Sequence, residues 1–395
     1  MRIGVDATCW SNRRGYGRFA RALLTRVLEL DGSNRYLFFT DQESTEFPMP
    51  ARAETVRVAA EVPAARAAAA DGRRALGDLW AMSRAISAAK LDLVFFPSIY
   101  SYVPLTSSVP KLVTIHDVIP ELYPHLVFPT WRSRLFWRAK IKMGCAQARL
   151  IVTVSEYSRR CLAEHLGIAP GRLRVVQEAS DPAFRPINGT GPRAVLGRLG
   201  LREGARLLAY VGGFSPHKNL SVVIDVLREL RAEPRFADLQ LVLVGDYTGD
   251  VFFSCYREVR KQVQELGLEE HVIFSGYLGD EDIAAVLNAA EVLLLPSFCE
   301  GVGLPALEAA ACGTPVVVTR RSPLPELLGE GAIALEPEDR AGWREAVRRI
   351  LLEPELAKRM SAAGLEAVAR LSWEASARQL LAIFEEVAGG RRATA

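Results

Sequence analysis

The stretch VLLLPSFCEGVGLPALEAAACGTPVVVT, residues 292–319, decides the fold class. It begins with four apolar residues, typical of a buried strand, and ends with a second run of the same kind. Between them, Pro305 suits a helix start, whereas Gly313 and Pro315 suit a helix end. A strand, a helix and another strand in this order predict two parallel strands joined by a crossover helix.

Strand-like runs alternate with helical patterns along almost the whole chain of 395 residues. Apolar strands in this alternation indicate parallel sheets that helices cover on both faces. Ten strands are too many for one open sheet, so we expect an α/β protein with two Rossmann-like, doubly wound domains. The predicted strands are Arg2–Asp6, Tyr36–Thr40, Leu93–Phe96, Lys111–Ile115, Leu150–Val154, Leu207–Val211, Leu239–Val244, His271–Ser275, Val292–Pro296 and Val316–Thr319.

A segment rich in Pro, Gly, Asn and Asp, Ser180–Arg193, indicates a hinge between the two domains. We therefore predict one domain over residues 1–187 and a second over residues 188–370. Residues 371–395 are predicted to form a C-terminal helix and a short tail.

Two glutamates flank the glycine-rich turn of the opening stretch. Glu300 lies in the turn, and Glu308 is expected in the first turn of the helix, beside the positive end of its dipole. The turn and the helix start form an anion site at the carboxyl end of a parallel strand. Carboxylates accept hydrogen bonds from paired sugar hydroxyls, so a nucleotide-sugar explains both features. The alternative is a solvated Glu300 and a Glu308 that merely favours a helix N-terminus.

A second glycine-rich loop, YVGGFSPHKNL at Tyr210–Leu220, follows the first strand of the second half. Gly212 and Gly213 end the strand, and Lys218 lies just before the next helix. A lysine in this position suits the neutralisation of a diphosphate. Taken alone, the loop is equally typical of a turn with a surface lysine.

These segments resemble the retaining nucleotide-sugar glycosyltransferases of family 4, also called group 1, which have the GT-B fold. The double-glutamate segment is specific to that family, whereas the other segments are weak signals one by one. Together they span nearly the whole chain in the family's order. The matching residues are Gly15–Phe19, His116–Asp117, Thr153–Ser158, Val211–Gly212, Pro216–Asn219, Glu300–Ala309 and Ala311–Val317.

The resemblance implies two domains that face a central cleft, with the nucleotide-sugar donor held mainly by the second. It also implies that the C-terminal helix, at Trp373–Val387, crosses back onto the first domain. Glu308 would bind the ribose, and Glu300 would hold the donor sugar. Lys218 would neutralise the diphosphate, and His116 would reach the sugar from the first domain. The expected catalytic residues are His116, Lys218 and Glu300, and the expected donor-binding residues are Gly15, Gly17, Gly212, Gly213, Ser215, Lys218, Tyr277, Leu278, Glu300, Gly301, Val302, Gly303, Leu304 and Glu308.

The implied reaction moves a hexosyl unit from GDP-mannose or a UDP-hexose to a sugar or lipid-linked acceptor, with retention of configuration. Fixed N–H groups and Lys218 would stabilise the departing diphosphate. Neither glycine-rich loop contains an Asp-x-Asp pattern, so no essential metal and no other cofactor are expected. Relatives often carry an arginine where this chain has Gly213 or His217, and Arg320 and Arg321 are conceivable replacements.

Two alternatives of other kinds stay open. Gly15–Ala20 matches the G-x-G-x-x-A pattern of NAD-dependent oxidoreductases, although Ala7–Arg14 separates it from its strand. The oxidoreductase alternative also leaves the two glycine-rich loops of the second half unexplained. The other alternative keeps the fold but makes the chain an epimerase, a phosphorylase or a non-catalytic nucleotide-sugar binder. Loss of Lys218 or of either glutamate would favour the last of these, yet all three are present.

Charge is divided unevenly along the chain. Residues 1–188 carry 26 Lys/Arg and 17 Asp/Glu, a net of +9, whereas the remainder carries 23 and 29, a net of −6. The segment Trp131–Arg149 has six basic residues, no acidic residue and several aromatic ones. It indicates either contact with an anionic membrane or a partly buried helix with solvated arginines. Membrane contact would suit a lipid-linked acceptor in polysaccharide or glycolipid assembly.

Several other classes of protein are not expected. The N-terminus reads as a strand instead of a signal peptide, so we expect a cytoplasmic protein, with the cytoplasmic face of the inner membrane as its site of contact. The six cysteines are scattered without metal-ligand spacing. Nucleic acid is not an expected partner, because the net charge is only +3 and no nucleic-acid-binding motif is visible.

Overall fold

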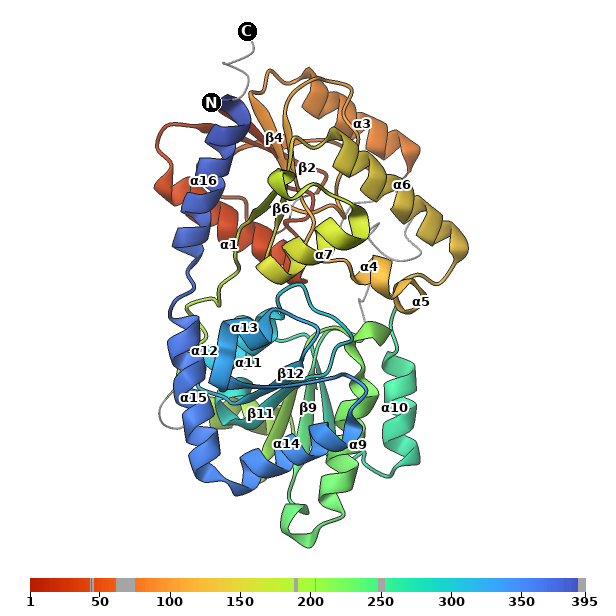
Figure 1. The fold of residues 1–395 in the computed structure, drawn as a ribbon, viewed down its shortest axis with the longest axis vertical. Coiled ribbons are helices and arrows are strands. Elements are labelled where there is room, and N and C mark those ends of the chain that lie inside the picture. The colour runs from red at the N-terminus through yellow and green to blue at the C-terminus, as the bar shows by residue number, and fades with distance from the viewer. Residues whose placement is uncertain are drawn as a thin grey trace. The chain divides into compact units, whose positions relative to one another are not determined.

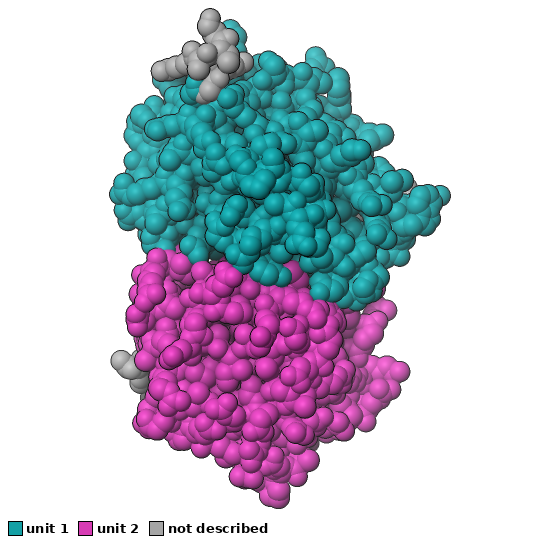
Figure 2. Space-filling view, viewed as in Figure 1, with its two compact units in different colours: residues 1–178, 372–395 teal, residues 179–371 magenta. Residues whose placement is uncertain are grey.

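The computed structural model describes residues 1–42, 44, 46–61, 75–187, 191–202, 204–247 and 253–389. Contacts between Cα atoms divide the chain into two compact units, which Figure 2 colours separately. Unit 1 consists of Met1–Glu178 and Ser372–Ala395, and unit 2 consists of Ala179–Leu371. Each unit is built on its own parallel sheet (Figure 1).

In the described part of unit 1, seven strands form a parallel sheet in the order β3-β2-β1-β4-β5-β6-β7. The chain moves from β1 toward one edge and from β4 toward the other, so the strand order reverses between these two neighbours. The strands are β1 (Arg2–Asp6), β2 (Arg35–Thr40), β3 (Glu54–Arg57), β4 (Leu93–Phe96), β5 (Lys111–Thr114), β6 (Leu150–Thr153) and β7 (Leu173–Val175).

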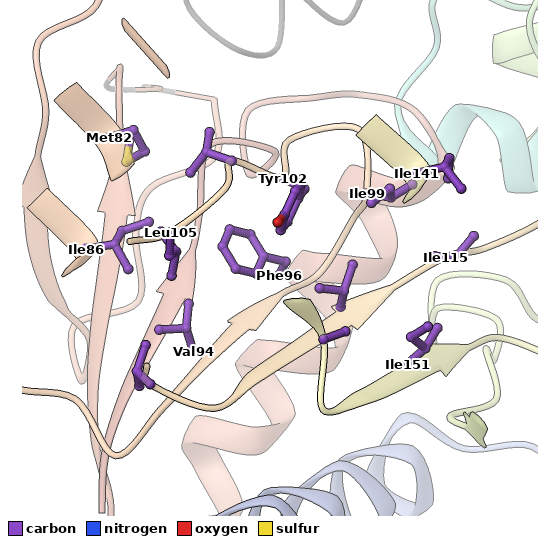
Figure 3. Packing of buried hydrophobic residues seen from close by; sticks show 14 of the residues in the cluster. Met82, Ile86, Val94, Phe96, Ile99, Tyr102, Leu105, Ile115, Ile141 and Ile151 are labelled. Atoms are coloured by element: carbon purple, nitrogen blue, oxygen red, sulfur yellow. The ribbon is translucent and has the colours of Figure 1, made fainter. Parts of the chain in front are cut away.

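Helices cover both faces of this sheet, because alternate strand residues point to opposite sides. Val94 and Phe96 of β4 face one layer, in which Met82 of α3 and Ile141 of α6 join the same core cluster (Figure 3). Phe95 points the other way and contacts α16. The described helices of unit 1 are α1 (Gly15–Leu30), α3 (Leu76–Ala88), α4 (Ile119–Leu122), α5 (Pro124–Val127), α6 (Trp131–Gln147), α7 (Glu156–Leu166) and α16 (Trp373–Gly389), with a 3-10 turn η1 (Pro170–Arg172).

The C-terminal helix α16 packs beside α1, although the two are separated by most of the chain (Figure 1). Buried residues recur along α16 at steps of three and four, which is the period of one helix face. Polar contacts fix the same helix, since Arg174 pairs with Glu386 at 2.5 Å and Ser376 donates to the carbonyl of Gln177 at 2.5 Å. The buried residues are Trp373, Ser376, Ala377, Leu380, Ile383, Phe384 and Val387.

In unit 2, the described residues form a six-stranded parallel sheet in the order β10-β9-β8-β11-β12-β13. The strands are β8 (Leu207–Val211), β9 (Gln240–Val244), β10 (Val272–Gly276), β11 (Ala290–Leu295), β12 (Val316–Thr319) and β13 (Ala332–Leu335). The helices are α8 (Gly191–Arg198), α9 (Leu220–Arg231), α10 (Tyr256–Glu265), α11 (Asp280–Ala289), α12 (Leu304–Ala311), α13 (Leu324–Leu328), α14 (Arg340–Leu352) and α15 (Pro354–Val368). The 3-10 turns are η2 (Pro216–Lys218), η3 (Pro234–Phe236) and η4 (Gly329–Gly331). None of the described helices in either unit is long and apolar enough to cross a bilayer.

The prediction of two doubly wound parallel sheets is confirmed, and the opening stretch forms β11, α12 and β12 in the expected parallel pairing. Three strands were not predicted, namely β3, β7 and β13, and all three lie at sheet edges. Strands β3 (ETVR) and β7 (LRV) lack the continuous apolar run by which the central strands are predicted, whereas β13 (AIAL) is apolar but short and only partly buried.

The contacts divide the chain between Glu178 and Ala179, earlier than the predicted boundary between residues 187 and 188. Residues 188–190 of the predicted hinge lie outside the described residues. The predicted C-terminal helix is present as α16, and it groups with unit 1, the side of the chain onto which the resemblance has it cross back.

We expect Phe384→Ala to destabilise unit 1 by about 3–5 kcal/mol, because it removes a fully buried ring from the layer over the sheet. The Phe384 ring packs edge-on against Phe95, with centroids 5.6 Å apart. Urea unfolding followed by circular dichroism measures the change. Glu385→Ala, on the exposed side of the same helix, is the matched control. Equal stability of the two variants would contradict a core role for α16.

Candidate functional site

The carboxyl ends of β8 and β11 mark the place where the strand order of unit 2 reverses. The two strands are hydrogen-bonded neighbours, but the chain continues from them toward opposite edges of the sheet. Loops that leave such a pair diverge, and doubly wound sheets bind ligands at this point. The loop after β8 contains η2, and the loop after β11 leads into α12.

Lys218 and Glu300 come from these two loops and form an ion pair. Lys218 Nζ donates to Glu300 Oε1 at 2.7 Å, and Ser297 Oγ donates to the same oxygen at 2.5 Å. The N–H of Phe298 also donates to the carbonyl of His217 at 2.8 Å, so the main chains of the loops are joined. The two charged side chains are 19% and 9% exposed, a setting in which salt screens a pair only weakly.

The backbone beside this pair adopts conformations that few residues tolerate. Gly303 has a φ of +84°, and a Cβ there would lie 2.7 Å from Leu324 Cδ1, so the turn into α12 requires glycine. Asn219 is the one non-glycine residue with positive φ in the described ranges. Its side chain donates to the carbonyls of Pro296 at 3.2 Å and Pro337 at 2.9 Å. These bonds hold the residue that follows Lys218.

Glu308 is completely buried and lies further along α12 than expected. The helix begins at Leu304, with Pro305 second, so Glu308 is the fifth helical residue. The prediction that it lies in the first turn is therefore wrong, because the left-handed Gly303 ends the loop and the helix starts at Leu304, one residue before Pro305. Burial lowers the local dielectric and strengthens any hydrogen bond that this carboxylate forms.

Three adjacent strands of unit 2, β8, β9 and β10, have a glycine at their carboxyl ends, namely Gly212, Gly245 and Gly276. The N–H of Gly212 donates to a carbonyl of β9 at 2.9 Å, and the N–H of Gly245 donates to the carbonyl of Gly276 at 3.1 Å. A Cβ on Gly245 would lie 2.0 Å from the Gly212 oxygen, so no other residue fits there. Tyr277, which is 42% exposed, and the partly buried Leu278 follow this edge directly.

The other predicted donor-binding residues shape the two loops. The carbonyl of Gly213 accepts a hydrogen bond from the hydroxyl of Tyr210 at 2.7 Å. Ser215 is buried, and its carbonyl accepts from the N–H of Lys218 at 2.9 Å. In the second loop, residues 301–304 are all buried. The structure thus brings both predicted glycine-rich loops to one place.

Arg320 and Arg321, the conceivable sources of a second positive charge, have acidic partners. Arg321 pairs with Glu338 at 3.0 Å and with Glu336 at 3.0 Å. Arg320 lies 3.8 Å from Glu336. The main chain of Arg321 also accepts a hydrogen bond from the N–H of Glu300 at 3.1 Å. This residue therefore positions the Glu300 loop through its backbone, while its guanidinium pairs with Glu336 and Glu338.

Unit 1 has its own reversal of strand order, between β1 and β4, and aromatic side chains gather near it. Tyr16 at the start of α1 stacks on Tyr100 after β4, with ring centroids 5.4 Å apart. Tyr100 in turn lies 4.9 Å from the ring of Trp137 in α6. A Cβ on Gly17 would lie 2.0 Å from the Asn12 carbonyl oxygen, so α1 needs this glycine, whereas Gly15 is sterically unrestricted.

His116 follows β5, as the sequence predicts, and packs edge-on against Phe19 with ring centroids 4.9 Å apart. Burial lowers its pKa to about 4, because a charged imidazolium would lose its hydration. The ring is therefore neutral at pH 7. Neither ring nitrogen has a hydrogen-bond partner among the described residues. A neutral imidazole of this kind can donate to or accept from a ligand hydroxyl.

Glu121 is a candidate that the sequence analysis missed. Trp137 Nε1 donates to its Oε1 at 2.7 Å, and its buried Oε2 has no partner in the described part of the chain. Burial raises its pKa to about 7, and the nearby Asp117 adds to the rise. The sequence signal was the acid five residues after His116, but only the fold reveals that it is buried beside Trp137.

Two family models match the chain, one over most of each unit. The family model described as glycosyl transferases group 1 matches residues 196–367, which lie in unit 2. The model described as glycosyltransferase family 4 matches residues 15–184, which cover most of the first part of unit 1.

The chain belongs to the family 4 (group 1) glycosyltransferases.

Two curated relatives have about the same sequence identity to this glycosyltransferase. An MMP alpha-(1->4)-mannosyltransferase of Mycolicibacterium hassiacum is 32% identical over 266 residues, which are 65% of this chain and 60% of that protein. A D-inositol 3-phosphate glycosyltransferase of Saccharomonospora viridis is 31% identical over 271 residues, 68% of this chain and 62% of that protein. The matched part thus spans less than two thirds of either relative.

The fold of the glycosyltransferase is GT-B. A solved structure of sucrose-phosphate synthase from Thermosynechococcus elongatus superposes with a TM-score of 0.78 at 20% sequence identity. The match covers 99% of this chain and 100% of that one. The GT-B fold expected from the sequence is therefore confirmed.

We expect Lys218→Met to destabilise unit 2 of this glycosyltransferase by about 2 kcal/mol, because Glu300 would keep a nearly buried charge without its cation. Lys261→Met is the matched control, since Lys261 pairs with Glu265 at 3.2 Å on the exposed side of α10 and such pairs contribute little. Thermal and urea unfolding measure both variants. An equal decrease in the free energy of unfolding for the two variants would show that burial of the Lys218 pair does not contribute to stability.

Glu121 makes the stability of the glycosyltransferase depend on pH. Its pKa is raised from 4.5 to about 7, so between these values the folded chain retains a proton that the unfolded chain releases. Its contribution to stability therefore falls as the pH rises through this window, by about 1–3 kcal/mol in total. Glu121→Gln should remove this fall, which urea unfolding at pH 5 and pH 8 detects. The exposed Glu164→Gln is the control, and a Glu121→Gln curve parallel to wild type would refute the assignment.

Proposed function

We propose that the protein is a retaining glycosyltransferase that moves a hexosyl unit from a nucleotide-diphosphate sugar to a sugar or lipid-linked acceptor. The observation that carries the proposal is the contact between Lys218 and Glu300 at the reversal of strand order in unit 2. A cation for a diphosphate and a carboxylate for sugar hydroxyls stand side by side at the place where such sheets bind ligands. GDP-mannose and a UDP-hexose are the proposed donors.

In the proposed reaction, the bond from the anomeric carbon to the diphosphate breaks and a bond to an acceptor oxygen forms on the same face. Lys218 stabilises the charge that develops on the departing diphosphate. Glu300 and the main chain of the glycine turn hold the sugar, and Glu308 binds the ribose. The acceptor hydroxyl gives its proton to a phosphate oxygen of the leaving group. Gly212, Tyr277 and Leu278 line the nucleotide end of the site.

We assign the acceptor to the residues near the strand reversal of unit 1. His116 is neutral there and offers a donor or an acceptor to a hydroxyl group. Glu121 and the stacked rings of Tyr16 and Tyr100 suit a saccharide, which presents both hydroxyl groups and apolar ring faces. We further propose that the protein acts in polysaccharide or glycolipid assembly at the cytoplasmic face of the inner membrane.

The dinucleotide alternative is not favoured. Gly15 is the first residue of α1, and the segment 7–14 separates it from β1, so the glycines do not directly follow their strand. Family membership also favours a transferase over an oxidoreductase. An Asp-x-Asp sequence does occur at Asp280–Asp282 in the first turn of α11, where Asp282 pairs with Arg198 at 2.7 Å. Metal independence therefore stays a prediction for experiment.

The test is release of nucleoside diphosphate from UDP-, GDP-, ADP- and TDP-hexoses, with EDTA present. We expect one donor to be consumed, and we expect Lys218→Met and Glu308→Gln to lower the rate at least about 100-fold, because each removes a donor contact. Lys261→Met is the matched control and should keep the wild-type rate. If hydrolysis needs an acceptor and no release is seen, calorimetry measures donor binding directly. No release and no binding of any donor would overturn the proposal, and a requirement for added metal would overturn its metal-independent form.

A further inference from the structure

Helix α6 carries apolar residues on two opposite faces. The inner face, with Trp137, Ile141 and Gly144, is buried and packs into the core of unit 1. On the outer side, four large apolar side chains are exposed by 41–74%. One apolar face is sufficient to attach a helix to its unit, so folding of unit 1 leaves the second face unexplained. The four exposed residues are Trp131, Leu135, Phe136 and Met143.

Basic side chains surround this outer face. Arg132, Arg134, Arg138 and Lys142 are all exposed, and none of them forms an ion pair within the described residues. The segment 131–149 contains no acidic residue. With 100° per residue, Arg134 and Arg138 border the apolar arc on one side, and Arg132 and Lys142 lie within it. We call these four basic residues and the four exposed apolar residues the outer face of α6.

The charge of the outer face decides between two kinds of partner. A second copy of this chain would place two sets of like charges against each other, which is unfavourable. An anionic lipid surface offers the complementary charge over a wide area and an apolar interior for the large side chains. Arginine and lysine can keep their heads among lipid phosphates while their stems lie along apolar surface.

We propose that the outer face of α6 is a docking surface for an anionic lipid bilayer. The helix would lie in the plane of the interface, with Trp131 and Phe136 at the boundary between headgroups and acyl chains. Binding to the bilayer does not depend on the proposed function. Only the role of this binding rests on it, namely that docking brings a lipid-linked acceptor to unit 1. The inner side of the same helix supplies Trp137, which donates to Glu121, and Lys140, which donates to the Tyr100 carbonyl at 2.5 Å. One helix would thus connect the lipid surface with the proposed acceptor residues.

Flotation of the full chain with vesicles tests the docking surface. Vesicles of 70% phosphatidylcholine and 30% phosphatidylglycerol should bind the protein at low salt and release much of it at high salt, because salt screens the charges. Pure phosphatidylcholine should bind it weakly. The double substitution Arg134→Glu with Arg138→Glu should weaken binding at least about 25-fold, and Trp131→Ser with Phe136→Ser should weaken it about tenfold or more. Leu352→Ser with Arg359→Glu, at exposed positions of unit 2, is the matched control and should bind like wild type.

Tryptophan fluorescence locates the contact within unit 1. Brominated lipids in the same vesicles should quench the wild-type emission, and Trp131→Phe should lose most of this quenching. Trp80→Phe is the matched control, because Trp80 of α3 is also exposed, by 60%, but lies outside the proposed surface. Loss of quenching with Trp80→Phe alone would overturn the proposal, since it would assign the contact to another helix.

The remaining outcomes each bear on the proposal. No binding of wild type to anionic vesicles, or binding that the α6 substitutions leave unchanged, would overturn it. So would a dimer in sedimentation experiments that the same substitutions dissociate, because the outer face would then bind a second copy. Circular dichroism and donor hydrolysis without vesicles show that the variants are folded. If the protein binds vesicles but neither hydrolyses nor binds any donor, the docking surface stands and the transferase proposal is refuted. If it uses or binds a donor but does not bind anionic vesicles, the docking surface is refuted and the transferase proposal stands.

Discussion

The reversal of strand order is the constraint on which the rest of the structure depends. In a parallel sheet, every strand presents its carboxyl end at the same edge, and only at a reversal do two neighbouring loops diverge. Unit 2 reverses between β8 and β11, and unit 1 between β1 and β4. Lys218 and Glu300 lie at the reversal of unit 2, and the aromatic rings beside Glu121 lie near the reversal of unit 1. Within each group the residues are far apart in sequence, and the topology of the sheet brings them together.

Much of this arrangement was predictable from the sequence, and the reasons for the exceptions are physical. The central strand β8 is apolar throughout and β11 is apolar over Val292–Leu295, since these residues are buried on both faces. The edge strand β3 lacks this pattern, so it was missed. The turn at Gly303 was recognisable as glycine-rich, but its left-handed geometry, which moves Glu308 into the second turn, depends on the packing of Leu324 against it. Glu121 was missed because its burial comes from a helix that follows it in the chain.

The two groups of residues differ in their electrostatics. In unit 2, Lys218 and Glu300 form an ion pair in direct contact. In unit 1, burial favours the uncharged forms of both His116 and Glu121. A charged pair suits a ligand that carries phosphate, whereas neutral polar groups suit a hydroxyl compound. The difference follows from position: the unit 2 pair is bridged across two loops at the sheet edge, and the unit 1 groups lie against the rings of Phe19 and Trp137.

The place of α16 in unit 1 has a consequence for synthesis on the ribosome. Translation completes residues 179–371, the whole of unit 2, before the helix that covers one face of the first sheet has been made. Until Phe384 emerges, the face around Phe95 lacks its partner, so the unit that is made first finishes folding last. During that interval the nascent chain exposes part of its sheet core, which is the kind of surface that chaperones bind. Tags or truncations at the C-terminus consequently act on the stability of the N-terminal unit.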